Sequence, residues 1–258
     1  ESVKRAVENT WDGDRYKRLV TKDGEWIGGK GARIELDLIT QAFSALSGIC
    51  DKERVKTALD TARGLVDVEN KLIKITDKPA TGARLGYISS YHEGVRENGG
   101  QYTHAAVWYT LALITSGRNE EAFDALMLLN PIARLHDKEM VYKYKGEPYV
   151  LAADIYTSPK YYGRMGWSWY TGSAAWYYRA ALALFGVSVK NRRLTFEPRL
   201  PKKLDKVNLE YRYKDAVYLI KLVRKSESAF YLDGLRIDGG MSVPLKESGR
   251  HKIEIHVV

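Results

Sequence analysis

The residues of this chain that could do chemistry gather at two points, each a glycine-rich segment followed by an apolar run. The first is Arg96-Glu97-Asn98-Gly99-Gly100-Gln101-Tyr102-Thr103-His104, which precedes the apolar residues 105–114. Consecutive glycines let a backbone approach a ligand closely, and the apolar run predicts a buried helix. The first turn of a helix has unpaired N–H groups and a positive dipole end. This junction therefore suits an anion or a hydroxylated ligand.

The second point repeats this arrangement in Gly163-Arg164-Met165-Gly166-Trp167-Ser168-Trp169-Tyr170-Thr171-Gly172-Ser173, which runs into residues 174–184. Taken alone, Thr171 and Ser173 are also typical helix caps, and His104 is also typical of a hydrogen-bonded core histidine. Taken together, two junctions with tryptophans, arginines and a carboxylate indicate a sugar site with an anion pocket. The candidate substrate-binding residues are Arg96, Glu97, Gln101, Arg164 and Trp169.

Composition excludes several other classes of protein. The chain has 258 residues, of which 45% are hydrophobic and 28% are charged, so it can bury a large core. A single cysteine, Cys50, cannot form a disulfide framework, and the five histidines lack metal-ligand spacing. We therefore expect no metal site. No apolar run is long enough to span a membrane and no leader peptide is recognisable, so we expect a cytoplasmic location.

The formal net charge of +9 is concentrated near the end of the chain. From residue 190 onward there are 16 Lys and Arg against 9 Asp and Glu, which accounts for +7 of that charge. The basic residues alternate singly with apolar ones instead of forming a cluster. This pattern favours a solvated strand face over a nucleic-acid site.

The elements that must position the two junctions are helices. Apolar periodicity predicts a hairpin of helices at 34–47 and 52–65, and a second pair at 105–115 and 120–129 that Asn130-Pro131 ends. Residues 67–93 are expected to be a long loop. A second long loop is expected after Asn130-Pro131, and it contains Tyr142, Tyr144, Glu147, Pro148 and Tyr149. Residues 150–156 are expected to be a short helix or an extended run. The helices alternate between wholly apolar and amphipathic, which predicts an inner and an outer ring.

From residue 186 the pattern changes to short alternating runs typical of strands. They lie at 194–198, 207–213, 217–223, 230–232, 241–244 and 251–258. We therefore predict a mainly helical domain at 1–188 and a small antiparallel β-sheet domain at 189–258.

Three long segments resemble the inverting glycoside phosphorylases of glycoside hydrolase family 94. They are residues 96–105, Glu147-Pro148-Tyr149-Val150 and residues 166–174, and Trp11-Asp12-Gly13 and Leu232-Asp233-Gly234 fit as well. The resemblance covers essentially the whole chain. Two short sequences, Ala153-Asp154-Ile155-Tyr156 and Trp169-Tyr170-Thr171, are more similar to the phosphorylase module of cyclic β-1,2-glucan synthetases and to 1,2-β-oligoglucan phosphorylases than to cellobiose phosphorylases.

The resemblance implies a fold and a set of roles. The fold would be an incomplete (α/α)6 barrel followed by the small antiparallel β domain. Glu97 would hold hydroxyls of the transferred glucosyl unit, and His104, Thr171 and Gly172 would bind phosphate. A β-linked gluco-oligosaccharide and inorganic phosphate, with no cofactor, would yield α-glucose 1-phosphate. Met165 departs from the family, which usually has a small residue there.

One essential residue of the family has no counterpart here. Its general acid is an aspartate in a Trp-Asn-Asp motif, and this sequence lacks that motif. The chain therefore looks like the C-terminal part of a phosphorylase. An upstream segment or another chain would complete the barrel, and a homodimer is also compatible with the sequence. Asp12, Asp14 and Asp154 are substitute acids. Alternatives are a helical-barrel hydrolase with Glu97 as the base and a non-catalytic carbohydrate-binding remnant.

Overall fold

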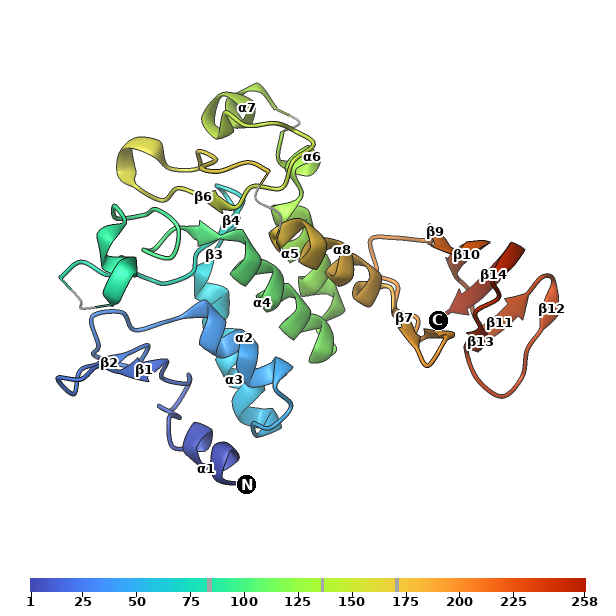
Figure 1. Ribbon diagram of the computed structural model, residues 1–258, viewed down its shortest axis with the longest axis horizontal. Coiled ribbons are helices and arrows are strands. Elements are labelled where there is room, and N and C mark those ends of the chain that lie inside the picture. Colours follow the sequence, from blue (N-terminus) through green and yellow to red (C-terminus); the bar gives the residue numbers. More distant parts are fainter. Residues whose placement is uncertain (83–84, 136, 170–171) are drawn as a thin grey trace. The chain divides into compact units, whose positions relative to one another are not determined.

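The computed structural model describes residues 1–82, 85–135, 137–169 and 172–258, which form two compact units (Figure 1). Unit 1 comprises Glu1–Ala180 and is mainly helical, and unit 2 comprises Ala181–Val258 and consists largely of strands. The predicted order of helices followed by sheets is confirmed. The helices are α1 (Ser2–Glu8), α2 (Leu38–Leu46), α3 (Lys52–Ala62), α4 (Thr103–Thr115), α5 (Asn119–Leu129), α6 (Pro131–Arg134), α7 (Lys138–Tyr144) and α8 (Gly172–Leu184).

Short strands in unit 1 form three two-stranded sheets that connect its loops. The pairs are β1 (Leu19–Val20) with β2 (Trp26–Ile27), β3 (Val66–Asp67) with β4 (Leu72–Ile73), and β5 (Gln101–Tyr102) with β6 (Asp154–Ile155). Single 3₁₀ turns occur at η1 (Arg63–Leu65), η2 (Gly86–Ser90) and η3 (Pro159–Tyr161). The segment 150–156, expected to be a short helix or extended, is therefore extended at its end.

The helix hairpin predicted from periodicity is formed by α2 and α3. Asp37 caps α2 by accepting a hydrogen bond from the Thr40 N–H at 2.8 Å, and Asp51 caps α3. After α2, Gly48 has a φ of +68°, which a residue with a side chain adopts only with strain. Local capping therefore sets where both helices begin and where the first one ends.

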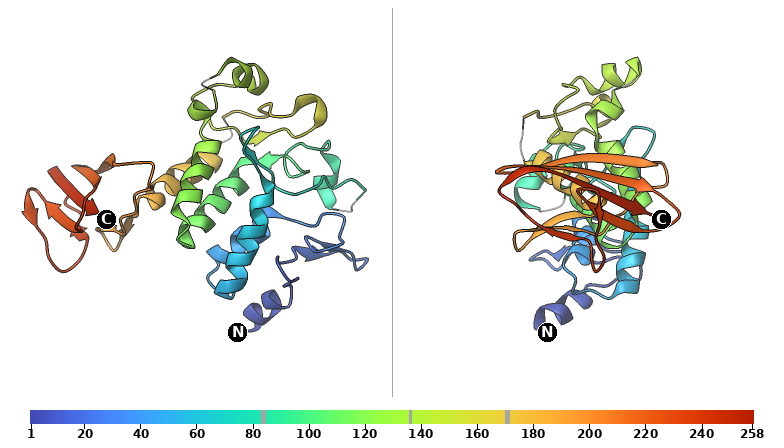
Figure 2. Two further views of the ribbon diagram at one scale, coloured as in Figure 1. Left: turned by 180° about the vertical axis from the view of Figure 1, so that it is seen from behind. Right: turned by 90° about the vertical axis from the view of Figure 1, so that its right-hand side faces the viewer.

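Helix α4 lies at the centre of unit 1. Figures 1 and 2 show α2, α3, α4 and α5 side by side, and α4 packs against both α2 and α5. Nine of its residues are buried, distributed all around the helix, whereas α3 and α5 each bury one stripe. The predicted alternation of wholly apolar and amphipathic helices is thus present in the structure.

Two short helices occupy a region that the sequence analysis assigned to a loop. Asn130-Pro131 ends α5 as predicted, but it also starts α6, because the Asn130 Oδ1 accepts hydrogen bonds from Ile132 N and Ala133 N at 2.9 and 3.2 Å. Proline at the first helical position favours such a start. Helix α7 is capped by Asp137 through the Met140 N–H at 2.8 Å. The prediction of a continuous loop was therefore wrong.

Unit 2 contains two sheets whose inner faces enclose one hydrophobic core, which includes Leu194, Phe196, Ile220, Phe230 and Ile255. The sheets have strand orders β12-β11-β14-β10-β9 and β13-β8-β7. Their strands are β7 (Val187–Lys190), β8 (Arg193–Phe196), β9 (Lys206–Tyr213), β10 (Asp215–Arg224), β11 (Ala229–Leu232), β12 (Leu235–Arg236), β13 (Ser242–Pro244) and β14 (Ser248–Val257).

The predicted all-antiparallel sheet was wrong in one respect. Strands β10 and β14 run parallel, with Ile220 opposite Ile253, while β9 and β11 pair antiparallel with their neighbours. Alternation of buried and exposed residues has the same period in either direction of a strand. The sequence pattern therefore located these strands without determining their direction.

Candidate functional site

Strand β6 joins the two segments that the sequence analysis selected. On one edge it pairs with β5, and the Thr103 N–H at the start of α4 donates to the Ala153 carbonyl at 3.0 Å. On the other edge, Ala153 N donates to Trp167 O at 2.9 Å and Gly166 N donates to Asp154 O at 3.0 Å. Segments 96–104 and 163–169 thus lie on opposite edges of the same short strand.

The glycines of the first segment serve the fold of the loop itself. Gly99 and Gly100 are buried, and a Cβ built on Gly100 would lie 3.0 Å from the carbonyl oxygens of Gly94 and Arg96. Asn98 closes the loop by accepting a hydrogen bond from Ala80 N at 2.5 Å and donating to Tyr91 O at 2.7 Å. We expected these glycines to approach a ligand, but here they approach the protein's own backbone.

Arg96 and Glu97 lie in this tight loop. Arg96 has a φ of +50°, and its guanidinium lies 5.4 Å from the Tyr91 ring centroid and 5.7 Å from that of Trp167. The guanidinium of Arg96 therefore lies within cation–π distance of Tyr91, which precedes the first segment, and of Trp167 in the second segment. Glu97 is half-buried, and its Oε2 atom is buried without a hydrogen-bond partner among the described residues.

The starts of α4 and α8 meet at His104. A Cβ built on Gly172 would lie 3.1 Å from the His104 Nδ1 atom, so glycine permits this approach. The His104 ring stacks beside Trp108 at 4.4 Å and Trp176 at 5.8 Å between centroids. Burial lowers the pKa of His104, which favours the neutral form of the imidazole. Its Nε2 atom is buried and has no partner in the described part of the chain.

Asp154 lies on β6 between the two segments and is completely buried. Its Oδ1 atom accepts a hydrogen bond from Trp167 N at 3.1 Å, whereas Oδ2 finds no partner in the ranges that the structure describes. Burial raises the pKa of Asp154, and the negative charge of Glu97 adds to this, against the opposing effects of the Trp167 N–H and Arg96. The group is therefore easier to protonate than an ordinary aspartate.

The other predicted site residues have the following positions. Gln101 is buried, and its amide accepts from Ile73 N at 2.8 Å and donates to the Thr103 hydroxyl at 3.0 Å, so it fixes the start of α4. Arg164 and Trp169 are exposed, with Arg164 over the Tyr161 ring and Trp169 against the Tyr149 ring. Thr171 lies outside the described residues.

The sequence analysis did not select Trp108 and Trp176. Each follows its junction residue by four positions, Trp108 after His104 and Trp176 after Gly172, which places it one helical turn farther on the same face. That shared spacing was the available signal. The two indoles meet edge to face at 6.1 Å and enclose the imidazole.

Asp12 and Asp14, which were considered as substitute acids, are engaged elsewhere. Asp12 accepts a hydrogen bond from the Lys30 N–H at 2.7 Å, and Asp14 pairs with Arg15 at 2.7 Å. The hydrogen bond from Arg15 lowers the pKa of Asp14. Both carboxylates therefore already have partners within residues 12–30.

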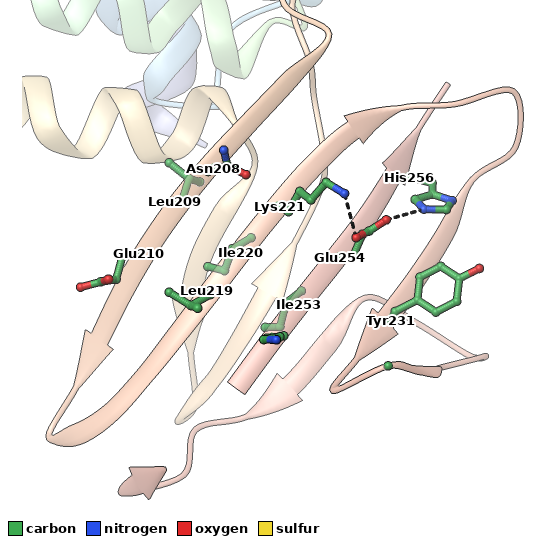
Figure 3. A pocket seen from close by; sticks show the side chains of 12 residues that line it. Asn208, Leu209, Glu210, Leu219, Ile220, Lys221, Tyr231, Ile253, Glu254 and His256 are labelled. Atoms are coloured by element: carbon green, nitrogen blue, oxygen red, sulfur yellow. Dashed lines mark hydrogen bonds and ion pairs between the residues drawn. The ribbon is translucent and has the colours of Figure 1, made fainter. Parts of the chain in front are cut away.

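A hollow lies on the outer face of the five-stranded sheet of unit 2 (Figure 3). The Glu254 carboxylate accepts from the Lys221 ammonium at 3.0 Å and lies 3.0 Å from the His256 Nε2 atom, and Tyr231 stacks on His256. These polar groups satisfy one another. Among the described residues, no group of three or more His, Cys, Asp or Glu is placed to hold a metal, and no helix has the length and apolar character of a membrane span.

Comparison with known proteins assigns a family to the region that contains the first site. Residues 1–185 match the model of the glycosyl hydrolase 94 superfamily, catalytic domain. The chain is 40% identical over 88% of its length to the cyclic β-(1,2)-glucan synthase NdvB of Rhizobium meliloti, of which it covers 8%. It is 26% identical over 92% of its length to the solabiose phosphorylase of Paenibacillus borealis and to the N,N'-diacetylchitobiose phosphorylase of Vibrio proteolyticus, covering 31% of each.

Proposed function

Because the chain belongs to the glycosyl hydrolase 94 superfamily, we propose that it forms part of the catalytic domain of a glycoside phosphorylase. In this proposal the junctions around His104 and Gly172 bind phosphate, and Glu97 binds hydroxyls of the sugar being transferred. The reaction is inverting phosphorolysis of a β-glucan to α-glucose 1-phosphate. Inorganic phosphate is a substrate, and no cofactor is required.

The observation that carries the proposal is the contact between the starts of α4 and α8. It brings together an imidazole with an unpartnered Nε2 atom and the first residue of a 13-residue helix. Helix starts have unpaired N–H groups and favour anions. Buried polar atoms in native proteins usually have partners, and Glu97 and Asp154 each contribute another buried oxygen without one. A bound phosphate and sugar would supply these missing partners.

Phosphate makes a separate general base unnecessary. An inverting hydrolase needs one carboxyl group to protonate the leaving oxygen and another to activate water. Phosphate is already an anionic nucleophile, so the protein needs only to hold it in line with the anomeric carbon. His104 and the helix start of Gly172 perform that task here. We expect the general acid to come from sequence outside residues 1–258.

We further propose that unit 1 contributes to an (α/α)6 barrel, with α2, α4 and α8 as inner helices and α3 and α5 as outer ones. The distribution of buried residues in α4 compared with α3 and α5 supports this assignment. A β-1,2-linked glucan is the proposed substrate, because the 40% identical relative is named for cyclic β-(1,2)-glucan synthesis.

The test is an assay with β-1,2-gluco-oligosaccharides and phosphate that measures glucose 1-phosphate. The chain alone should be inactive, since protonation of the leaving oxygen is typically worth about 10²- to 10⁴-fold in rate. Adding the segment that precedes it in its open reading frame should restore activity that depends on phosphate. His104→Ala should reduce that activity, and His256→Ala in unit 2 is the matched control.

Three results would contradict the proposal. Release of free glucose independent of phosphate, lost in Glu97→Gln, would identify a hydrolase in which Glu97 acts as the base. Glucan binding without any product, even with the preceding segment present, would identify a non-catalytic carbohydrate-binding chain. Turnover by the chain alone that Asp12→Asn abolishes would place the acid within this sequence.

A further inference from the structure

Trp108 has no role in the function proposed above, although its indole Nε1 atom is buried and has no hydrogen-bond partner among the described residues. The same holds for the Glu97 Oε2, His104 Nε2 and Asp154 Oδ2 atoms of the candidate site. Trp108 lies one turn after His104 on α4, and the centroids of the two rings are 4.4 Å apart. A buried donor without a partner is destabilising, so a ligand that pairs with it gains affinity.

The surroundings of Trp108 show what kind of partner its N–H needs. An indole N–H donates a hydrogen bond and cannot accept one. The Trp108 ring meets Phe43 of α2 at 5.1 Å and Trp176 of α8 at 6.1 Å, both edge to face. Neither ring carries an oxygen, and an N–H that points at an aromatic face gains much less than one paired with oxygen. The missing partner is therefore an acceptor that the described residues do not supply.

The neighbours of the imidazole indicate which nitrogen of His104 carries the proton. A Cβ built on Gly172 would lie 3.1 Å from the His104 Nδ1 atom and 3.3 Å from Cε1, so this edge of the ring faces the first residue of α8. The first N–H groups of a helix are unpaired and lie at its positive end. A lone pair on Nδ1 is stable there, whereas a proton on Nδ1 would face other N–H groups. In the neutral ring the proton is then on Nε2.

His104 Nε2 and Trp108 Nε1 are in that case two buried donors on one face of α4. Because their rings are in contact, a tetrahedral oxyanion that accepts hydrogen bonds at about 2.8 Å can reach both donors with different oxygens. Arg179 of α8 adds a positive charge beside these rings, since its guanidinium lies 4.5 Å from the Trp176 ring centroid. The arrangement favours a ligand with several acceptor oxygens and a negative charge.

We propose that the Trp108 indole N–H and the His104 Nε2–H form a donor pair that binds two oxygens of one phosphate ion. Trp108 is then a phosphate-binding residue, and the start of α8 at Gly172 selects the tautomer of His104 that makes the pair possible. The role of Trp108 rests on the proposed function, because the ligand is the same phosphate ion.

Calorimetric titration with inorganic phosphate tests the role of Trp108. Trp108→Phe keeps an aromatic ring but removes the N–H, so phosphate should bind about tenfold or more weakly. Trp176→Phe is the control for packing, because Trp176 contacts the same imidazole and its Nε1 atom is not among the unpartnered buried atoms. It should weaken phosphate binding by less than about threefold. Equal weakening in the two variants would overturn the donor pair, because packing alone would then explain both.

Nuclear magnetic resonance of the wild-type chain tests the same contact without relying on the stability of a variant. Isotopically labelled tryptophan gives one indole N–H signal for each of the six tryptophans, and the signal that is missing in Trp108→Phe or Trp108→Tyr belongs to Trp108. Phosphate should shift this signal downfield more than the other five, because a new hydrogen bond forms at this N–H. A Trp108 signal that stays in place while phosphate binds would overturn the role of Trp108.

The tautomer of His104 is tested with labelled histidine and with sulfate. Nitrogen chemical shifts distinguish protonated from unprotonated ring nitrogens, and His104→Ala identifies the signals of His104. With phosphate bound, Nε2 should carry the proton of the neutral ring. Sulfate has no proton to donate at neutral pH, so it should compete with phosphate with an affinity within about tenfold. A proton on Nδ1 instead, or a site that binds phosphate but never sulfate, would overturn the assignment.

The outcomes separate this role of Trp108 from the proposed function. A wild-type chain that binds no phosphate, even together with the segment that precedes it, would overturn both. Phosphate binding that His104→Ala weakens and Trp108→Phe leaves unchanged would overturn the donor pair alone.

Discussion

Two regions of this molecule combine glutamate and histidine, and they differ in whether those groups have partners. On the sheet of unit 2, Glu254 contacts both Lys221 and His256 at 3.0 Å. In unit 1, the Glu97 Oε2 and His104 Nε2 atoms are buried and have no partner among the described residues. The charged groups of the unit 2 cluster therefore have partners within the cluster, whereas the two unit 1 atoms have none among the described residues.

We infer from this difference that the sheet cluster is structural and that the unit 1 cluster is a candidate ligand site. An unpaired buried polar group costs about 1–3 kcal/mol of folding free energy. A ligand that supplies the partner recovers that free energy on binding, which makes the unit 1 cluster suited to a ligand. The sheet cluster offers a ligand no such gain, because each of its charged groups would first have to leave a neighbour.

The largest difference in stability between the two regions should come from replacing a glycine in each of them by alanine. Gly166→Ala places a methyl group 2.3 Å from the Asp154 Oδ1 atom, whereas Gly234→Ala meets no atom within 4 Å and suffers only from its φ of +87°. We expect a loss of about 3 kcal/mol for Gly166→Ala from overpacking. Gly234→Ala should cost about 1 kcal/mol.

Tryptophan fluorescence measures the first variant in denaturant, and hydrogen exchange of unit 2 measures the second. Equal losses of folding free energy in the two variants would contradict this expectation, because they would show that the carboxyl group of Asp154 moves aside freely.

The next effect concerns phosphate. His104→Ala should weaken phosphate binding about tenfold or more, since a hydrogen bond to a charged ligand contributes about 1.5–3 kcal/mol. It should weaken glucan binding less. His256→Ala removes a histidine whose Nε2 atom is already paired with Glu254, so phosphate affinity should not change. Calorimetric titration with inorganic phosphate measures the affinity of both variants. Equal losses of phosphate affinity in His104→Ala and His256→Ala would indicate binding by overall charge alone.

The smallest effect concerns the sheet cluster itself. The hydrogen bond from Lys221 lowers the pKa of Glu254, with His256 contributing further. A lowered folded-state pKa gives stability that is present above the unfolded pKa and lost as pH falls through the folded pKa. Glu254→Gln should therefore cost less than about 1 kcal/mol at pH 7, and its difference from wild type should vanish in acid.

Hydrogen exchange of β14 at pH 7 and pH 4 measures this difference, and high salt should also reduce it. The direction of the pKa shift is opposite to that of Asp154, whose pKa is raised by burial. A Glu254→Gln protein that becomes more stable than wild type as pH rises would remove the contrast between the two regions.

The sequence by itself determined the features that depend on near neighbours. Asp51 marks the start of α3 and Gly48 the end of α2 because caps and left-handed glycines act within a few residues. The start of the first helix was predicted at residue 34, whereas Asp37 caps α2 and the helix begins at Leu38. The same locality located most strands of unit 2 and both junctions at 96–104 and 163–173. Asn130-Pro131 misled the analysis, since the same residues end one helix and start another.

Only the tertiary structure decided which distant residues meet and which lack partners. The parallel pairing of β10 with β14, the contact of Gly172 with His104 and the burial of Asp154 between two segments all join residues far apart in sequence. Such contacts depend on how strands are paired and helices packed, and no local pattern encodes a missing hydrogen bond. The residues of the candidate site were therefore proposed from the sequence, but their unpaired buried atoms appear only in the folded chain.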